Sequence, residues 1–245
     1  MKRSLLALAL ITSGCTPKPG SPGVAAVAVA DPVALLARAR AEPVSTPRDA
    51  SFSVSLHTPT DDVSAQGSLV VSPPDRFRVE LRGPIGPPAM VVTCDGHQLL
   101  AWATTKNQAW RADDADSALR RLTGEAAGIA AVADLLLGRL PAIGEPTWET
   151  DHYRWTGPAG EVVEARLDPA TAHLLAVHAT DAAGAILLDA RYTPSVLPKT
   201  LDLDLPAIGA RASVVFKEWQ EVAPPDSAFT LTLPDTVAVT PLFPG

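Results

Sequence analysis

Apolar and polar residues alternate with a period of two through most of the chain from residue 50 onward. In the segment 76–82, Phe77, Val79 and Leu81 alternate with three arginines and a glutamate, which predicts a strand with one dry and one charged face. Asp95-Gly96 separates two further runs, and this dipeptide accepts the positive φ angles of a tight turn. The first half of the chain is therefore predicted to form a meander of strands.

After residue 147 the alternation resumes in segments of strand length, separated by turns rich in glycine, proline and aspartate. The strands predicted in this half are Trp148–Thr156, Glu161–Asp168, His173–Thr180, Ala185–Tyr192, Leu201–Leu205, Arg211–Glu221 and Ala228–Leu233. Strands at this spacing predict one antiparallel sheet that curls into a barrel or a sandwich. Alternation alone does not choose between these two.

A short helix is predicted near the N-terminal end of the folded part. Asp31 can cap it, Pro32 suits its first turn, and it ends before Pro43. The helix precedes the first alternating segment. Its apolar face is supplied by Val33, Leu35, Leu36 and Ala39.

A helical insertion is expected at about residues 114–140, between the two sets of strands. Asp114 or Asp116 can cap a first helix that ends at Gly124. A second helix is expected over the range 125–137, and it stops at a glycine that is followed by a proline. The apolar side of this second helix consists of Ile129, Val132 and Leu136.

The first residues have the features of a secretory leader. Lys2 and Arg3 precede a short apolar run that is too short to span a bilayer, and small residues precede Cys15. We predict a signal peptide over residues 1–14, lipidation at Cys15, and a flexible lipid-anchored linker over residues 15–31. The rest, residues 32–245, is predicted to be a single domain. The alternative is an ordinary secretory signal that happens to contain a cysteine.

Composition and charge exclude several classes of protein. Hydrophobic residues make up 47% of the chain, enough for a sizeable core, and the 24 prolines disfavour long helices. The formal charge of −7 repels the phosphate backbone of nucleic acids, so no nucleic-acid partner is expected. Cys94 lies in an apolar run and is predicted to be a small core residue.

Sequence signatures of catalysis are absent. The five histidines contain no pair with the spacing of a zinc-hydrolase helix. The chain also has no nucleophile elbow and no phosphate-binding glycine loop. Asp202 and Asp204 point to one face of a predicted strand, where solvated surface carboxylates are expected. We therefore expect no enzymatic activity, no cofactor and no metal.

Two local pieces and the order of elements resemble a known family. The pieces are the segment 74–86, PDRFRVELRGPIG, followed by the Asp95-Gly96 hairpin, and the segment 135–141, LLLGRLP, at the end of the insertion. Over about residues 32–240 the chain resembles the LolA/LolB lipoprotein-localisation family, and LolB most closely because of Cys15. The resemblance implies an unclosed antiparallel β-barrel of about eleven strands. It also implies a helical lid over an apolar cavity that takes the acyl chains of other lipoproteins.

The residues expected to line this cavity are apolar residues from the strands and from the insertion, and they could equally pack together as a filled core. They are Phe77, Val79, Leu81, Leu100, Trp102, Ile129, Val132 and Leu136. The resemblance further implies a protruding loop that assists insertion into the membrane. It corresponds to Gly83, Pro84, Ile85 and Gly86, with Ile85 as its apolar tip. The alternative for this loop is a proline-rich turn with a buried isoleucine.

The resulting functional hypothesis is a monomeric lipoprotein anchored at the periplasmic face of the outer membrane. It would receive acylated lipoproteins from a LolA-like periplasmic carrier and assist their insertion. Thr16 is not the aspartate that retains lipoproteins at the inner membrane, which favours the outer membrane. The alternatives are a structural or interaction lipoprotein with a filled β core, and a soluble LolA-like carrier.

Overall fold

The computed structural model of the chain describes residues 29–41, 45–83, 88–141, 144–157 and 159–243. Within them, fourteen strands form one unclosed sheet in the order β14-β6-β5-β4-β3-β2-β1-β13-β12-β11-β10-β9-β8-β7. The strands are β1 Arg48–His57, β2 Asp62–Ser72, β3 Arg76–Arg82, β4 Pro88–Asp95, β5 Leu99–Ala103, β6 Gln108–Ala112, β7 Thr147–Glu149, β8 His152–Thr156, β9 Val162–Leu167, β10 Leu174–Thr180, β11 Ile186–Tyr192, β12 Thr200–Leu205, β13 Ala210–Glu221 and β14 Ala238–Pro241. The predicted class, an unclosed and mainly antiparallel β-barrel with few helices, is confirmed, with more strands than the family implied.

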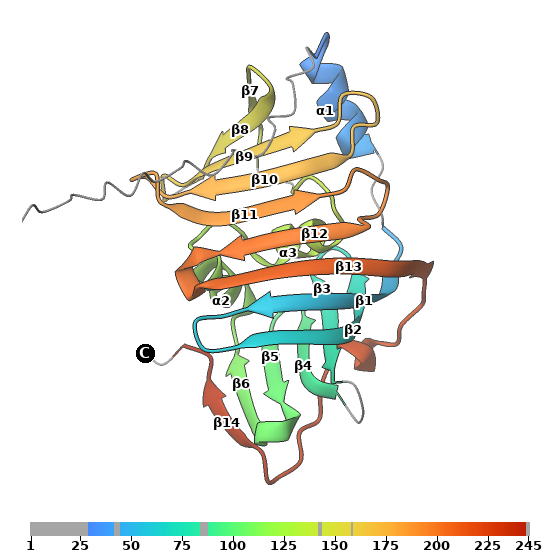
Figure 1. The fold of residues 1–245 in the computed structure, drawn as a ribbon, viewed down its shortest axis with the longest axis vertical. Coiled ribbons are helices and arrows are strands. Elements are labelled where there is room, and N and C mark those ends of the chain that lie inside the picture. Colours follow the sequence, from blue (N-terminus) through green and yellow to red (C-terminus); the bar gives the residue numbers. More distant parts are fainter. Residues whose placement is uncertain (1–28, 42–44, 84–87, 142–143, 158, 244–245) are drawn as a thin grey trace, which may run out of the picture.

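In the described part of the chain, three α-helices accompany the sheet: α1 Pro32–Ala41, α2 Ala115–Leu122 and α3 Ile129–Leu136. Helices α2 and α3 lie on one face of the strongly twisted sheet, and α1 lies at the end near β9 (Figure 1). The carboxylate of Asp31 accepts a bond from the amide of Ala34 at 2.9 Å, which begins α1 as predicted. The hydroxyl of Tyr153 donates to the carbonyl of Pro32 at 2.6 Å and attaches α1 to β8.

The core lies between helices α2 and α3 and the face of the sheet that they cover, which we call the concave face (Figure 1). Val71, Phe77, Cys94 and Leu99 lie opposite one another on β2, β3, β4 and β5, and each is at least 96% buried. Their neighbours in sequence point to the other face, as the period of two predicts. Burying each of the larger apolar side chains contributes about 1.5–3 kcal/mol to folding.

The segment after β13 differs from its prediction. Instead of a strand over Ala228–Leu233, a 3₁₀ turn runs from Asp226 to Phe229, and β14 follows later, parallel to β6. The Phe229 ring is fully buried beneath the Arg76 guanidinium, 4.9 Å away, and Arg78 donates to the carbonyl of Ala228 at 3.1 Å. The segment therefore packs across the convex face of β3–β6 instead of pairing as a strand.

Two further predicted boundaries are wrong. The segment predicted as one strand over Trp148–Thr156 is the hairpin β7–β8, which turns at Thr150 with φ 53°. Helix α3 begins at Ile129 rather than near Glu125, because Glu125 has φ 75° and cannot lie in a right-handed helix. Both residues adopt a left-handed conformation that alternation and helix periodicity do not reveal.

Candidate functional site: an apolar mouth beneath a two-helix lid

The concave face is closed at one end and half open at the other. Along β1, the exposed fraction rises from 0% at Ala50 through 5% at Phe52 and 8% at Val54, and Leu56 is only half-buried. Along the neighbouring β2 it rises in the same direction, from 0% at Val71 to 42% at Val63. The sheet therefore opens toward the hairpin that joins these two strands.

We call the half-open end of this face the apolar mouth. Its side chains point to the same face as the buried core residues and lie farther along the same strands. They are Leu56, Val63, Ala65, Leu81, Met90, Leu203, Leu205, Ala212 and Val214. Because these apolar groups come from β1–β4, β12 and β13, the mouth is a continuous property of the sheet rather than of one loop.

Helices α2 and α3 form a lid over the closed part of this face. Asp114 caps α2, since its carboxylate accepts bonds from the amide of Ser117 at 3.0 Å and from its hydroxyl at 2.7 Å. Asp116 links the two helices, because its carboxylate accepts from Arg120 Nε at 2.8 Å and from the amide of Ile129 at 2.9 Å. The bond from Arg120, partly opposed by burial and assisted by the Ile129 amide, lowers the pKa of Asp116.

A buried hydrogen bond attaches the lid to the sheet. The phenol of Tyr192 on β11 donates to the carbonyl of Leu135 in α3 at 3.0 Å. Burial raises the pKa of Tyr192 far above its usual value, so the phenol stays protonated and remains a donor. The carbonyl of Leu135 would lack this partner if α3 moved off the sheet, and moving the lid therefore has a cost.

Little free space remains between the lid and strands β9–β11. An apolar cavity of about 10 Å³ lies there, with Ala127, Leu135, Val177 and Leu188 among its walls. That is about the size of one water molecule. Among the described residues, the partly exposed apolar surface of the concave face is therefore at the mouth and not beneath the lid.

The structure brings six of the eight predicted cavity residues into one cluster. Phe77 and Ile129 are buried in it, and Val79, Leu81, Val132 and Leu136 are partly buried and pack against it. Strands β2 and β3 lie against α3, which carries Ile129, Val132 and Leu136.

The other two predicted residues, Leu100 and Trp102, lie elsewhere. They belong to a second cluster with Ala109 and Val237, on the convex face of β5 and beneath the C-terminal segment. Leu100 is the neighbour of the core residue Leu99, and in a strand neighbours point to opposite faces. The apolar run around them hid this alternation, so assigning them to the concave cavity was incorrect.

The remaining predicted sites lie mainly outside the described residues. Cys15 does so, as do Pro84, Ile85 and Gly86 of the predicted loop. Gly83 is described, and the space around its Cα is open. No helix among the described residues has both the length and the apolar composition needed to cross a membrane.

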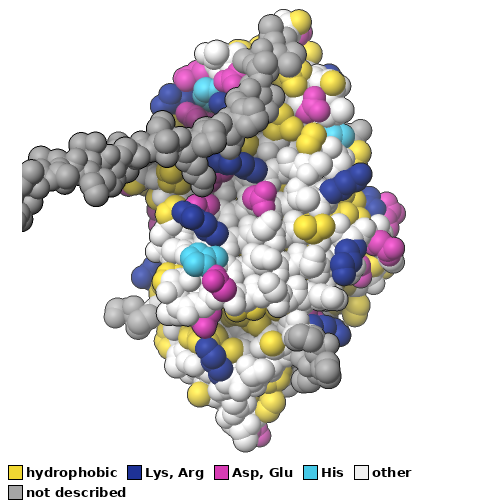
Figure 2. All heavy atoms as spheres, in the orientation of Figure 1, with side chains coloured by type: hydrophobic (Ala, Val, Ile, Leu, Met, Phe, Trp, Pro, Cys, Tyr) yellow, Lys and Arg dark blue, Asp and Glu magenta, His cyan; other side chains and the backbone are white. Residues whose placement is uncertain are grey.

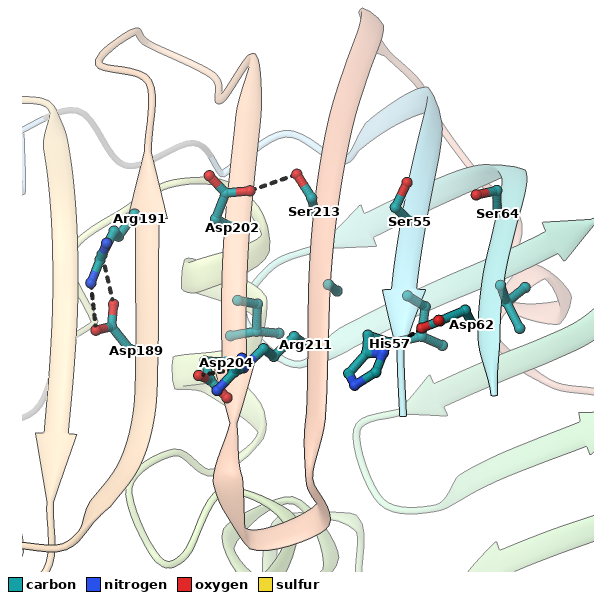
Figure 3. A pocket seen from close by; sticks show the side chains of 14 residues that line it. Ser55, His57, Asp62, Ser64, Asp189, Arg191, Asp202, Asp204, Arg211 and Ser213 are labelled. Atoms are coloured by element: carbon teal, nitrogen blue, oxygen red, sulfur yellow. Dashed lines mark hydrogen bonds and ion pairs between the residues drawn. The ribbon is translucent and has the colours of Figure 1, made fainter. Parts of the chain in front are cut away.

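The convex face carries a polar hollow that the sequence analysis did not single out. It has a volume of about 590 Å³ and lies across β11, β12, β13, β1 and β2, with Ser213, Ser55 and Ser64 in one row across three of these strands (Figure 3). Its polar residues are Ser55, His57, Asp62, Ser64, Asp189, Arg191, Asp202, Asp204, Arg211 and Ser213. Asp202 and Asp204 accept bonds from Ser213 and Arg211 there, as solvated surface carboxylates do. Figure 2 shows this face with scattered charges and few hydrophobic side chains at its middle.

The described residues include a buried thiol but no cluster of metal-ligating side chains. Among the described residues, no group of three or more His, Cys, Asp or Glu side chains gathers as a metal site would require. Cys94 is fully buried, and burial raises the pKa of its thiol to about 11. Its thiol is thus protonated at neutral pH and behaves as a small core group, as predicted.

Comparisons with known proteins give similarity at the level of the fold. No family model and no curated protein sequence matches the chain. Among solved structures, a LolA superfamily protein from Nitrosomonas europaea aligns with a TM-score of 0.52 at 12% identity, over 81% of this chain and 97% of that one. A DUF1329 family protein from Desulfovibrio piger gives 0.55 at 10% identity, over 80% and 95%.

A third structure, a domain from Vibrio parahaemolyticus described as an outer-membrane lipoprotein-sorting protein, gives a TM-score of 0.50 at 10% identity, over 77% of this chain and 91% of that one. At such identities the likeness concerns the fold and not the residues of a site. The chain thus has the fold of LolA superfamily and lipoprotein-sorting proteins.

Proposed function

We propose that this protein binds the acyl chains of lipoproteins at the apolar mouth and, after movement of the lid, along the concave face behind it. The observation that carries the proposal is the graded exposure of the concave face, from fully buried at Ala50 and Val71 to 42% at Val63. A core that served stability alone would gain nothing from leaving large aliphatic groups partly exposed along several adjacent strands.

Energetics favour an aliphatic ligand at this place. Each methylene that leaves water contributes about 0.8 kcal/mol, so a few methylenes against Leu56, Leu81 and Leu203 offset the loss of one buried hydrogen bond. The bond from Tyr192 to Leu135 is of that kind. Partial insertion at the mouth would therefore precede lid movement, and each further methylene would favour the open lid.

The finer proposal is a LolB-like role. Cys15 would carry a lipid anchor at the periplasmic face of the outer membrane, a LolA-like carrier would deliver acylated lipoproteins, and Ile85 would contact the bilayer. The protein would act as a monomer and without catalysis. The lipoprotein-sorting description of the Vibrio parahaemolyticus domain supports this role through the shared fold.

A matched pair of variants tests the coarse proposal. Val214 and Val215 are neighbours on β13, but Val214 packs against the concave cluster at the mouth, whereas Val215 is 48% exposed on the convex face. Native mass spectrometry with a triacylated lipopeptide should show binding weakened about tenfold by Val214→Ser and unchanged by Val215→Ser. Urea unfolding of both variants would show whether each is folded.

Absence of binding by the well-folded wild-type protein would contradict the proposal and favour the alternative of a structural lipoprotein with a filled core. The small volume beneath the lid is the observation that favours that alternative. The finer role has separate tests. Detergent-phase partitioning should be lost in Cys15→Ser, and membrane fractionation should recover the wild type with the outer membrane.

A further inference from the structure

The segment that follows β13 passes from one face of the sheet to the other. Leu233 and Val237 belong to the apolar cluster on the convex face. Strand β14 then pairs with β6 at the edge of the sheet (Figure 1). Beyond β14, Leu242 and Phe243 pack against the main core, which contains the lid helices. We call residues 238–243 the edge strap, because they lead around the edge of the sheet from the convex face to the lid.

The edge strap contacts the lid at helix α2. The ring of Phe243 lies 4.3 Å from the guanidinium carbon of Arg121, which is in the last turn of α2. The amide of Leu242 donates to the carbonyl of Arg111 at 2.8 Å, on the strand β6 that leads directly into α2. The strap therefore holds both the end of the helix and the strand from which the helix starts.

Few groups hold the edge strap itself. All four residues of β14 are exposed, and the pairing with β6 is parallel, which is slightly less stable per residue than antiparallel pairing. Segments with exposed backbone bonds and few buried apolar contacts open at a low free energy. Val237, just before the strap, is 92% buried and Phe229 is 99% buried. The strap can therefore detach while the segment before it stays packed on the convex face.

We propose that the edge strap is a detachable latch on the lid. When docked, it holds α2 against the sheet, and its release frees α2 to move. Helix α3 has a different attachment, the bond from Tyr192 to Leu135, and Asp116 joins the two helices. Movement of the whole lid therefore requires the release of both attachments. The latch is a property of the lid without any ligand, and only its effect on acyl-chain binding rests on the proposed function.

Protection of the sheet edge explains only part of this arrangement. A strand beside β6 covers its backbone groups, and Pro241 has no amide with which another chain could pair. Covering the edge does not require the residues after β14 to contact a helix. Leu242 and Phe243 nevertheless pack against the core on the lid side, and Phe243 meets Arg121 there. This contact is what couples the edge of the sheet to the lid.

Amide hydrogen exchange of the full chain, followed by mass spectrometry of peptides from α2, tests the latch. Phe243→Ala and Arg121→Gln should each accelerate exchange in α2 about two- to fivefold, as expected for an exposed cation–π contact. Arg121→Lys keeps a cation beside the ring and should retain most of the protection. The matched control Val239→Ala changes a residue of β14 that is 44% exposed, and it should leave exchange in α2 unchanged.

The double variant separates the latch from a purely local effect on the helix. Arg121 also lies where a positive charge stabilises the dipole of α2. If the contact with Phe243 is what matters, Arg121→Gln should add little in the Phe243→Ala background, because both changes remove the same contact. Effects that add in full, or exchange in α2 that neither single variant changes, would overturn the latch.

Binding of a triacylated lipopeptide distinguishes the latch from the proposed function. If both hold, Phe243→Ala should bind the lipopeptide up to about fivefold more tightly than the wild type, because the lid opens at lower cost. Faster exchange in α2 with no lipopeptide binding in either protein would support the latch and contradict the proposed function. Exchange in β1 should stay the same in all variants, and an increase there as large as in α2 would mean general destabilisation and overturn the latch.

Discussion

The two faces of the sheet use the same strands and meet opposite requirements. On the concave face, apolar side chains pass from a closed core to the half-open mouth. On the convex face, one cross-strand row runs from β2 to β8 and consists of ionisable residues throughout. The row comprises Asp62, His57, Arg211, Asp204, Asp189, His178, Glu164 and Arg154.

The difference lies in how the exposed groups of each face are compensated. Asp189 and Asp204 lie directly opposite each other, which alone is unfavourable, but Arg191 and Arg211 pair with them at 3.1 and 3.0 Å. The charges of the convex row are therefore compensated by ion pairs within the molecule and by hydration. The mouth leaves aliphatic surface in contact with water, a cost that burial against an apolar group would remove.

The largest expected effect comes from a residue at the closed end of the concave face. Leu69 is 2% exposed on β2, and Leu69→Ala should lower the free energy of unfolding by about 2–5 kcal/mol, because a cavity remains in the core. Ser64→Ala, on the same strand but the convex face, should change it by less than about 0.5 kcal/mol. Urea denaturation measures both. Similar losses in the two variants would contradict the assignment of the faces.

A smaller effect is expected where the lid meets the sheet. Tyr192→Phe removes one of two donors to the carbonyl of Leu135, which keeps its bond from the amide of Gly138, and should cost about 0.5–1.5 kcal/mol. Amide hydrogen exchange should accelerate in α3 more than in the central strand β1. If the proposed function holds, the same variant should bind a lipopeptide more tightly, since the lid opens at lower cost. Unchanged exchange in α3 would show that this bond does not hold the lid.

Asp116 should control the lid through its charge and its bond to α3. Asp116→Ala should cost about 1 kcal/mol, the usual size of a lost helix cap. The folded-state pKa of Asp116 is lowered, so its contribution is complete above the unfolded-state value of about 3.9 and is lost as pH falls through the folded-state value. The difference in unfolding free energy between wild type and Asp116→Ala should therefore be full at neutral pH and shrink in acid. A difference that grows in acid would contradict this role.

Alternation was sufficient to predict which residues of most strands face the core. The pair Phe77 and Arg78 shows why, since one is buried on the concave face and the other bonds to Glu80 on the convex face. It failed at Leu100 and Trp102, where both faces of β5 are covered and the sequence therefore reads as one apolar run. The cover of the second face comes from residues far away in the chain, which no local pattern encodes.

The site was predictable in its residue types but less so in its geometry. Val79, Leu81, Val132 and Leu136 were found from periodicity and pack against the same core cluster. The mouth residues on β12 and β13 were missed, because the depth of an apolar residue depends on how far the lid reaches and not on spacing. The convex row was missed for a related reason: it requires the register of strands that are distant in sequence.

The smallest expected effect concerns that convex row. Arg211→Gln removes the partner of Asp204 on a side chain that is 72% exposed, so the loss of one screened ion pair should cost at most about 1 kcal/mol. It also leaves Asp204 facing Asp189 with one guanidinium fewer, and Asp204→Asn in the same chain should recover most of the loss. A double-mutant cycle followed by urea denaturation measures this coupling, which should fade in high salt. A loss as large as that of Leu69→Ala would mean that the convex face, like the concave one, supports the fold through burial.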